Sequence, residues 1–511
     1  MAEPAPHIED GNGEPVFNTR RRIGLVLGAT VFVGMLLSAP PDGLSQAGWY
    51  TAATALLIAI WWVTEAIPLS ATGLVPLVAF PILGVTSIKA TAQPYAHPII
   101  FLLLGGFIIA LAMQRWNLHR RIALTIISKV GSRPPNVIGG FMLACAFISM
   151  WVFNTTTTIM MLPIAVSVIE LMRDKVGDDP AHAQSLRNFA TAMMVGVAYA
   201  ATIGGMGTLI GTAPNLVLAA FMSETYGVEV SFAQWMMIGV PMIAIMLPAA
   251  WFVLVKVVFP IDLPAMPGEE DLIKDQLRAM GPMSRGERTV LTVVAVAVFL
   301  WLFKDFVEQI IPWISLNDTS IGVLAAVSLF VIPVNLRKGV FALSGEWALK
   351  LPWGVVVMFG GGLSLASTIK SSGLSDWIGA GASLMTVLPT VAVVLIVVIL
   401  IIFLTELTSN TATTATFLPI VAAVAVGMGE NPLLLVFPTV LAASCAFMMP
   451  VATPPNAVVF ASGHITVAQM VRGGFLVNLI GIVVATVMAY TLVLLVFGIE
   501  PGVLPEWAQS G

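Results

Sequence analysis

Ten residues rich in hydroxyl, amide and carboxylate groups, 405–414, lie between two apolar runs of this chain. The runs, 391–404 and 417–426, are each shorter than the roughly 20 residues that a helix needs to cross a bilayer. Two short apolar arms around a polar centre predict a hairpin that enters a membrane and turns back, or one broken helix. Irregular backbone survives at membrane depth only where it lines protein or a watery cavity, so the polar centre is a candidate binding site.

The polar stretch has a copy earlier in the chain. Asn-Thr-Thr-Thr-Thr at 154–158 and Asn-Thr-Ala-Thr-Thr at 410–414 are offset by 256 residues, and Leu-Pro-Ile follows each run at the same offset. That offset also relates the glycine pairs 105–106 and 361–362. A second motif follows each copy, and two motif pairs in one order indicate an internal duplication. The second motif is Gly-Thr-Ala-Pro-Asn at 211–215 and Ala-Thr-Pro-Pro-Asn at 452–456.

The composition is that of a membrane protein. Hydrophobic residues make up 58% and charged residues 10% of the 511 residues, whereas soluble domains carry about 25% charged residues. We therefore expect an all-α polytopic membrane protein. A net charge of −4 gives no argument for a nucleic-acid partner. Cys145 and Cys445 lie in apolar runs, so no disulfide framework or thiolate metal site is expected. No nucleophile–base pair stands out, and we do not expect an enzyme.

Apolar runs and their breaks predict about eleven transmembrane helices plus two re-entrant hairpins. The expected divisions are a polar N-terminal tail (1–22), a first half (23–259), a cytoplasmic linker (260–287), a second half (288–498) and a C-terminal tail (499–511). The hairpins are expected at about 136–171 and 388–427. The other membrane segments are expected near 23–40, 48–68, 70–86, 98–114, 188–222, 232–258, 289–304, 318–335, 352–369, 432–461 and 469–498.

The basic residues indicate the orientation. With Arg20 to Arg22 placed inside, 20 of the 23 basic residues fall in inner loops, as the positive-inside bias predicts. The exceptions are Lys89, Lys304 and Lys370. The first helix is expected to stay uncleaved, with a cleavable signal peptide as the alternative. Five crossings, an odd number, separate the two glycine pairs, so we expect two inverted repeats, a cytoplasmic N-terminus and an outer C-terminus.

Inverted repeats with broken helices are typical of secondary transporters. A helix that begins after a polar turn presents free N–H groups to an anion, and a helix that ends there offers carbonyl oxygens to a hard cation such as Na⁺. Neither polar motif contains Lys or Arg, so the affinity for an anion is expected to depend on a bound cation. Glu406 is a candidate functional acid or a brace for its hairpin, and Glu65 is expected to be structural.

These residues resemble a known family, the divalent anion/sodium symporters, which include dicarboxylate, citrate and sulfate carriers. Ser-Asn-Thr at 409–411 looks like that family's hairpin-tip motif. Trp-Trp-Val-Thr-Glu-Ala-Ile-Pro-Leu at 61–69 is similar to its early signature, and Pro-Val-Ala-Thr-Pro-Pro-Asn at 450–456 resembles its second unwound loop. The resemblance spans about residues 50–490. It implies a homodimer in the lipid bilayer, in which a transport part moves against a scaffold like an elevator.

The same resemblance implies site residues by position. The carboxylates of the anion would contact Asn154, Thr155, Thr212, Asn410, Thr411 and Thr453. One Na⁺ would bind at Ser149, Asn154 and Gly211, and another at Thr405, Ser409, Asn410 and Ala452. The first copy departs from the family at Phe153, where Ser is usual, and this removes a hydroxyl from the first sodium site.

We therefore expect a secondary active transporter in the cell membrane, which is the inner membrane if the source is bacterial. The expected cargo is a small dianion, above all a C4-dicarboxylate such as succinate, moved together with Na⁺. Exchange of one dicarboxylate for another is an alternative, since some members of the resembled family are exchangers. Transport of sulfate or citrate and, from another class of protein, an anion channel also stay open.

Overall fold

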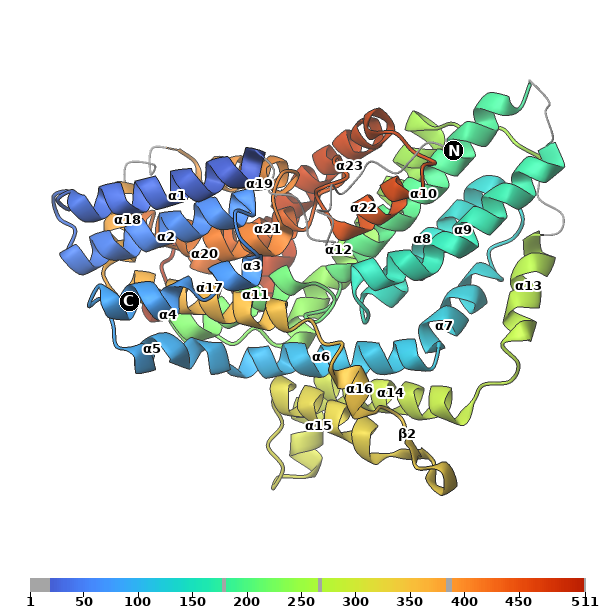
Figure 1. The fold of residues 1–511 in the computed structure, drawn as a ribbon, viewed down its shortest axis with the longest axis horizontal. Helices are drawn as coiled ribbons and strands as arrows, with labels where there is room; N and C mark the ends of the chain where they lie inside the picture. The colour runs from blue at the N-terminus through green and yellow to red at the C-terminus, as the bar shows by residue number, and fades with distance from the viewer. Residues whose placement is uncertain (1–18, 177–180, 265–268, 383–387, 510–511) are drawn as a thin grey trace.

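The computed structural model describes residues 19–176, 181–264, 269–382 and 388–509. Most of the predicted N-terminal tail, residues 1–18, lies outside the described residues. Helices form nearly all the regular structure of the described part (Figure 1), and the predicted all-α fold class is confirmed. The only strands in that part are β1 (Pro333–Asn335) and β2 (Val340–Phe341), a short antiparallel pair that the sequence reading missed.

The first half contains a series of helices of very different lengths. They are α1 (Thr19–Leu37), α2 (Gln46–Thr64), α3 (Leu69–Thr72), α4 (Val75–Ile82), α5 (Ile88–Ala92), the 3-10 turn η1 (Gln93–Ala96), α6 (Pro98–Arg115), α7 (Leu118–Ile127), α8 (Pro134–Ser149), α9 (Asn154–Val176), α10 (Ala183–Gly205), α11 (Ala213–Tyr226) and α12 (Phe232–Phe252), which continues as the π-helix η2 (Val253–Val258). Polar N-cap residues fix where several of these helices begin. The Ser45 and Ser231 side chains, for example, accept N–H groups from the first turns of α2 and α12.

The linker carries one helix, and the second half carries the rest. They are α13 (Glu269–Ala279), α14 (Arg285–Ile310), α15 (Asp318–Val331), the 3-10 turn η3 (Leu336–Lys338) between the strands, α16 (Gly345–Ala348), α17 (Trp353–Ser371), α18 (Leu374–Ala382), α19 (Thr390–Thr405), α20 (Asn410–Gly427), α21 (Pro432–Ala443), α22 (Pro454–Ala461), α23 (Val467–Met488), the π-helix η5 (Ala489–Val493), α24 (Leu494–Phe497) and α25 (Glu506–Gln509). α14 begins before the predicted segment 289–304 because Ser284 and Glu287 form a capping box.

The described helices confirm a multi-pass membrane protein. Eight spans, some of them made of joined helices, are long and apolar enough to cross a bilayer. Five shorter apolar helices accompany them, among them α8 and α19, the first arms of the two predicted hairpins. The count of eleven crossings, the re-entrant course of the hairpins and the division into halves and tails stay predictions.

Helix boundaries repeat with the offset found in the sequence. α8 and α19 are 256 residues apart at both their first and their last residues, and α9 and α20 begin 256 residues apart. α6 and α17 end at the same offset, and α7 and α18 begin at it. Because matched helices start or stop at matched residues, the duplication extends from the sequence to the local structure. The opposite orientation of the two copies in the membrane stays a prediction.

The two halves interlock. α11 of the first half packs against α17 and α20 of the second, while α22 of the second half packs against α9 and α10 of the first. α6 lies along α15, where a Cβ on Gly105 would stand 2.7 Å from the backbone of Gly322, so glycine is needed for this approach. α11 and α22, which follow the second motif of each half, therefore each lie against a hairpin arm of the other half.

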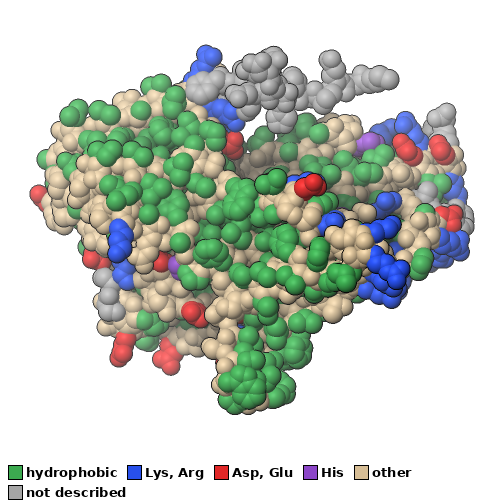
Figure 2. All heavy atoms as spheres, turned by 60° about the horizontal axis from the view of Figure 1, so that its bottom comes forward, with side chains coloured by type: hydrophobic (Ala, Val, Ile, Leu, Met, Phe, Trp, Pro, Cys, Tyr) green, Lys and Arg blue, Asp and Glu red, His purple; other side chains and the backbone are tan. Residues whose placement is uncertain are grey.

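Apolar side chains cover much of the face that Figure 2 shows, and Lys and Arg side chains gather at one end of it. This is the end at which α7 and α13 lie, whereas α18 lies at the opposite end (Figure 1). The gathering agrees with the predicted bias of basic residues toward one side of a membrane. Which side of the membrane that end faces stays a prediction.

Candidate functional site

Four helices begin at the residues of the two duplicated motifs. α9 begins at Asn154 and α20 at Asn410, while Thr212 and Thr453 occupy the positions just before α11 and α22. Non-helical stretches precede them at 150–153, 406–409, 206–212 and 444–453. The predicted breaks are thus confirmed. Each break leaves the first N–H groups of a helix without partners in that helix, which is the arrangement that favours an anion.

Two asparagines fold the longer breaks back on themselves. The Asn215 amide donates to the carbonyl oxygens of Gly205 at 3.0 Å and Thr208 at 2.7 Å. The Asn456 amide does the same in the other half, to Ala446 at 3.3 Å and Met449 at 3.0 Å. Proline in the first turn of each following helix suits a position where no N–H is required. The motif Pro-Asn therefore makes a local clamp, and this clamp explains the conformation of both loops.

The first predicted sodium set comes together around Gly205. The Ser149 hydroxyl donates to Asn154 Oδ1 over 2.7 Å, and Ser149 is fully buried. A Cβ on Gly205 would lie 2.6 Å from Asn154 Oδ1, and a Cβ on Gly211 would lie 2.5 Å from the Gly205 carbonyl oxygen. Hydroxyl, amide and backbone oxygens thus converge where a side chain would not fit, which suits a hard cation. The sequence reading missed Gly205, although a glycine beside a predicted break was a signal for it.

The second predicted sodium set repeats this geometry with one difference. The Thr405 hydroxyl lies 2.7 Å from Asn410 Oδ1 and 2.9 Å from the carbonyl oxygen of Ala443. Ser409 directly precedes α20, and Ala452 is buried in the loop before α22. In the described residues no hydrogen bond joins Ala452 to the other three. Thr405 and Asn410 are therefore in contact, and the Ala443 carbonyl is a further oxygen that the sequence did not indicate.

Most of the predicted anion contacts are only partly buried. Asn154, Thr155, Thr212, Asn410 and Thr411 are half-buried, whereas Thr453 is only 4% exposed. The Thr453 hydroxyl accepts the N–H of Asn456 at 3.3 Å, so its oxygen caps α22. Thr411 lines a narrow gap together with Val217 and Phe221 of α11. The roles of these residues stay a proposal.

Phe153 packs against a neighbouring helix. Its ring centroid lies 4.3 Å from that of Phe107 on α6, with the ring planes at 48°. Its carbonyl oxygen accepts the N–H of Thr157 at 2.9 Å, inside α9. The ring therefore packs the tip of the first helix pair, α8 and α9, against α6. Its effect on sodium binding stays a prediction.

Glu406 braces the loop before α22. Its carboxylate accepts the N–H groups of Phe447 at 2.7 Å, Met448 at 2.9 Å and Met449 at 2.9 Å. The Asn478 amide on α23 donates to the same carboxylate at 2.7 Å. The sequence left open a brace for the hairpin of Glu406 itself, whereas these bonds brace the loop before α22. A functional role for Glu406 stays a prediction. Asn478 was missed, although a polar residue in the apolar run of α23 was a signal for it.

Glu65 lies at the end of α2, and its expected structural role stays a prediction. It ends α2 with a left-handed backbone (φ 51°) and lies 3.6 Å from Arg21. Arg20, which precedes Arg21 in the chain, donates to the carbonyl oxygens of Val63 and Leu407. These bonds connect the start of α1 to the end of α2 and to the tip of the second helix pair, α19 and α20.

Comparison with known proteins decides the family. The profile described as "Sodium:sulfate symporter transmembrane region" matches residues 19–498. This chain belongs to that family. The match covers both hairpin motifs and both broken helices, so the resemblance seen in the sequence is confirmed.

Members of the sodium:sulfate symporter family with assigned roles are similar over nearly the whole chain. The sodium-dependent dicarboxylate transporter SdcS of Staphylococcus saprophyticus is 42% identical over 489 residues, covering 95% of this chain and 93% of that relative. SdcS of Staphylococcus aureus strain MRSA252 is 41% identical over 488 residues, with the same coverage.

Two solved transporters share the fold at 13% sequence identity. Neisseria gonorrhoeae MtrF superimposes with a TM-score of 0.54 over 93% of this chain and 98% of its own. The Alcanivorax borkumensis YdaH transporter gives a TM-score of 0.56 over 87% and 98%. At this identity the likeness concerns the fold alone.

Proposed function

We propose that this protein is a secondary active transporter that couples Na⁺ to the uptake of a C4-dicarboxylate such as succinate. The observation that carries the proposal is a matched pair of oxygen clusters, Ser149 with Asn154 and Thr405 with Asn410, each at the start of a helix. The names of the relatives, sodium-dependent dicarboxylate transporters at 41% and 42% identity, support this ion and this cargo.

The chemistry divides between buried oxygens and free helix ends. The oxygens of Ser149 and Thr405, together with nearby carbonyls, would take the place of water around Na⁺. The N-terminal N–H groups of α9, α11, α20 and α22 would bind the carboxylates, aided by the hydroxyls of Thr155, Thr212, Thr411 and Thr453. No Lys or Arg lies in these motifs. Arg20 donates to the Leu407 carbonyl oxygen beside the second one, and bound Na⁺ would supply the positive charge among the motif residues themselves. Affinity for the anion then depends on Na⁺, which is the physical basis of coupling.

The proposed assembly is a homodimer with inverted repeats and an elevator-type movement. α14 offers a further contact surface, because most of its side chains are not buried within the protein. Its exposed Phe299, Phe303 and Phe306 would face a partner subunit or lipid. The proposed orientation places the N-terminus in the cytoplasm and the C-terminus outside.

Uptake into proteoliposomes tests the proposal. Purified protein is reconstituted, and the initial uptake of labelled succinate is measured with an inward Na⁺ gradient, with a K⁺ gradient, and with succinate trapped inside. We expect saturable uptake that requires the Na⁺ gradient. Uptake that is independent of the Na⁺ gradient and requires trapped dicarboxylate would show exchange instead. A non-saturating, voltage-driven current would show a channel. Labelled sulfate and citrate, run in parallel, report the other two cargoes.

A further inference from the structure

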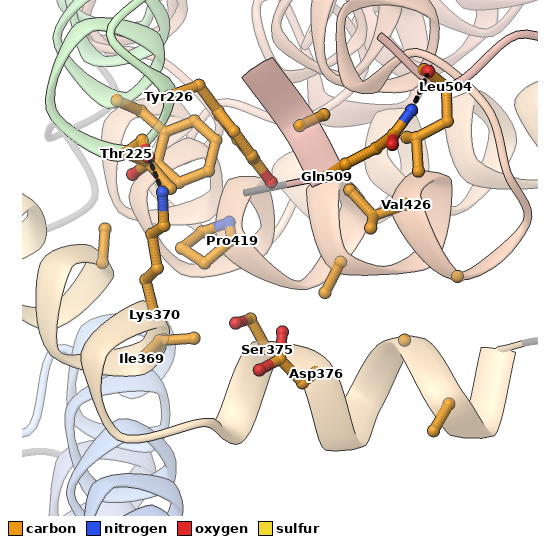
Figure 3. Close-up of a pocket in the computed structure, with 17 residues that line it drawn as sticks. Thr225, Tyr226, Ile369, Lys370, Ser375, Asp376, Pro419, Val426, Leu504 and Gln509 are labelled. Atoms are coloured by element: carbon orange, nitrogen blue, oxygen red, sulfur yellow. Dashed lines mark hydrogen bonds between the residues drawn. The ribbon is translucent and has the colours of Figure 1, made fainter. Parts of the chain in front are cut away.

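A cavity of about 450 Å³ lies between α11, α17, α18, α20 and the C-terminal segment 504–509 (Figure 3). We call it the Lys370 cavity. The Lys370 ammonium donates to the carbonyl oxygen of Thr225 and lies 5.3 Å from the centre of the Tyr226 ring. Ser375 and Asp376 line the cavity from α18, on the side away from Tyr226 and Gln509 (Figure 3). Its volume falls within the roughly 300–1,000 Å³ of small-molecule sites.

A narrow gap leads from this cavity toward the hairpin motif. The gap shares Phe221, Ala366 and Pro419 with the Lys370 cavity and reaches Thr411, one of the proposed anion contacts. Its free volume is about 10 Å³, and Met358, Phe359 and Leu418 narrow it. A space of that size holds about one water molecule, so a dicarboxylate cannot pass in this conformation. Apolar side chains therefore separate the cavity from Thr411.

The charge in the cavity is small and carried by few residues. Among the described lining residues, Lys370 is the one basic side chain and Asp376 the one acidic side chain. Lys370 is also one of three basic residues that the charge bias of the sequence assigns to the outer side. α18 lies at the end of the molecule opposite the end with α7 and α13 (Figure 1).

We propose that the Lys370 cavity is the outer entrance of the transport path, in which Lys370 attracts the dianion and Asp376 repels it before the gap opens. This proposal rests on the proposed function, because it names the entrance to that same site. A fixed charge a few ångströms from a dianion in a partly wet cavity changes its local concentration by about three- to tenfold, and added salt weakens the effect.

Substitutions of opposite sign test the proposal. In intact cells with an inward Na⁺ gradient, Lys370→Gln is expected to raise the KM for external succinate about three- to tenfold with little change in Vmax, and Lys370→Arg to restore it. Asp376→Asn is expected to lower the KM. The exposed residues Lys89 and Asp305 provide matched controls; Lys89→Gln and Asp305→Asn are expected to leave the KM unchanged. If Lys370 only anchored the end of α11, Asp376→Asn would not lower the KM, and that result would overturn the proposal.

A second experiment places either charge on one side chain of one folded protein. Ser375→Cys is introduced with Cys145 and Cys445 replaced by serine, and the cells are treated with membrane-impermeant methanethiosulfonate reagents. A reagent that adds a sulfonate is expected to raise the KM for external succinate, and one that adds a trimethylammonium of similar bulk is expected to lower it. Equal KM values after the two reagents would show that the cavity does not lie on the path.

The wild type separates this proposal from the proposed function. If wild-type cells show no Na⁺-dependent succinate uptake, the proposed function fails. If they do, and all charge variants keep the wild-type KM, only the entrance fails. Inside-out vesicles complete the test, because the Lys370→Gln effect on KM is expected to disappear when succinate is supplied from the cytoplasmic face. An equal effect from both faces would contradict an outer entrance.

Discussion

The ring of Phe153 packs against the ring of Phe107, with their centroids 4.3 Å apart, where the first helix pair meets α6. The hydroxyl expected at position 153 is thus replaced by an apolar contact between two helices. The second copy keeps its hydroxyl at Ser409, next to the Thr405 and Asn410 pair. We therefore expect unequal sodium sites, with the second binding Na⁺ more tightly.

Phe153→Ser should restore a ligand to the weaker site. We expect a lower Na⁺ concentration for half-maximal succinate uptake, or a higher Hill coefficient. The variant also loses a ring contact worth about 0.5–1.5 kcal/mol beyond burial, so its melting temperature should fall. Phe107→Ala removes the same contact without adding a hydroxyl, and should lower the melting temperature while leaving the Na⁺ dependence unchanged. If both variants shift the Na⁺ dependence alike, the effect comes from packing and the ligand explanation is wrong.

Ser409→Ala should act in the opposite direction. It removes a hydroxyl beside the tighter site, and we expect a marked rise in the Na⁺ concentration for half-maximal uptake. The exposed Ser320, at the start of α15, supplies a control in Ser320→Ala, which should behave as wild type. Uptake measured against a series of Na⁺ concentrations decides the matter, and an unchanged curve for Ser409→Ala would remove this residue from the site.

Asn154→Ala and Asn410→Ala should each abolish uptake while the protein stays folded. A hydrogen bond to a charged group is worth about 1.5–3 kcal/mol. Each asparagine also accepts a hydrogen bond from a hydroxyl five residues earlier, Ser149 or Thr405. Asn136 is exposed at the start of α8, so Asn136→Ala should transport normally. Size-exclusion profiles and melting curves check the folding of all three variants. Near-normal uptake by either motif variant would exclude that residue from the site.

Glu406→Gln should loosen the loop before α22. The glutamine amide would point an N–H₂ group at one of the four N–H donors that the carboxylate now accepts, which leaves a buried donor unsatisfied at a cost of about 1–3 kcal/mol. We expect a lower melting temperature and weaker Na⁺ dependence, because Ala452 lies in that loop. Glu430→Gln is the matched control; buried Glu430 binds Thr390 and the Gly502 N–H instead. It should lower the melting temperature but keep the Na⁺ dependence, and the same kinetic change in both variants would argue against a specific brace.

Local features of the chain were predictable from the sequence, and contacts between distant residues were not. The four helix starts followed from Asn, Thr and Pro at fixed spacing, because these residues act on the backbone within a few positions. The Glu406–Asn478 bond joins residues 72 positions apart. Gly205 next to Asn154 also depends on how α10 packs against the first helix pair. Such contacts depend on tertiary packing, and local sequence patterns do not predict it.

The short strands show the same limit. β1 and β2 form around a tight turn, in which Asn335 accepts the N–H of Lys338 and Gly339 has a positive φ of 63°. The Asn and Gly were visible in the sequence as turn residues. The strands themselves are three and two residues long, too short for any alternation of apolar and polar residues to appear.

Bound Na⁺ is expected to supply the charge that holds the anion, and equilibrium binding measures this dependence without transport. Succinate binding to the purified protein is measured by calorimetry in NaCl and in choline chloride of equal ionic strength, and Na⁺ binding is measured with and without succinate. We expect succinate to bind at least about tenfold more tightly in Na⁺, and Na⁺ affinity to rise by the same factor with succinate, as linkage requires. Equal succinate affinity in the two salts would show that Na⁺ does not hold the anion.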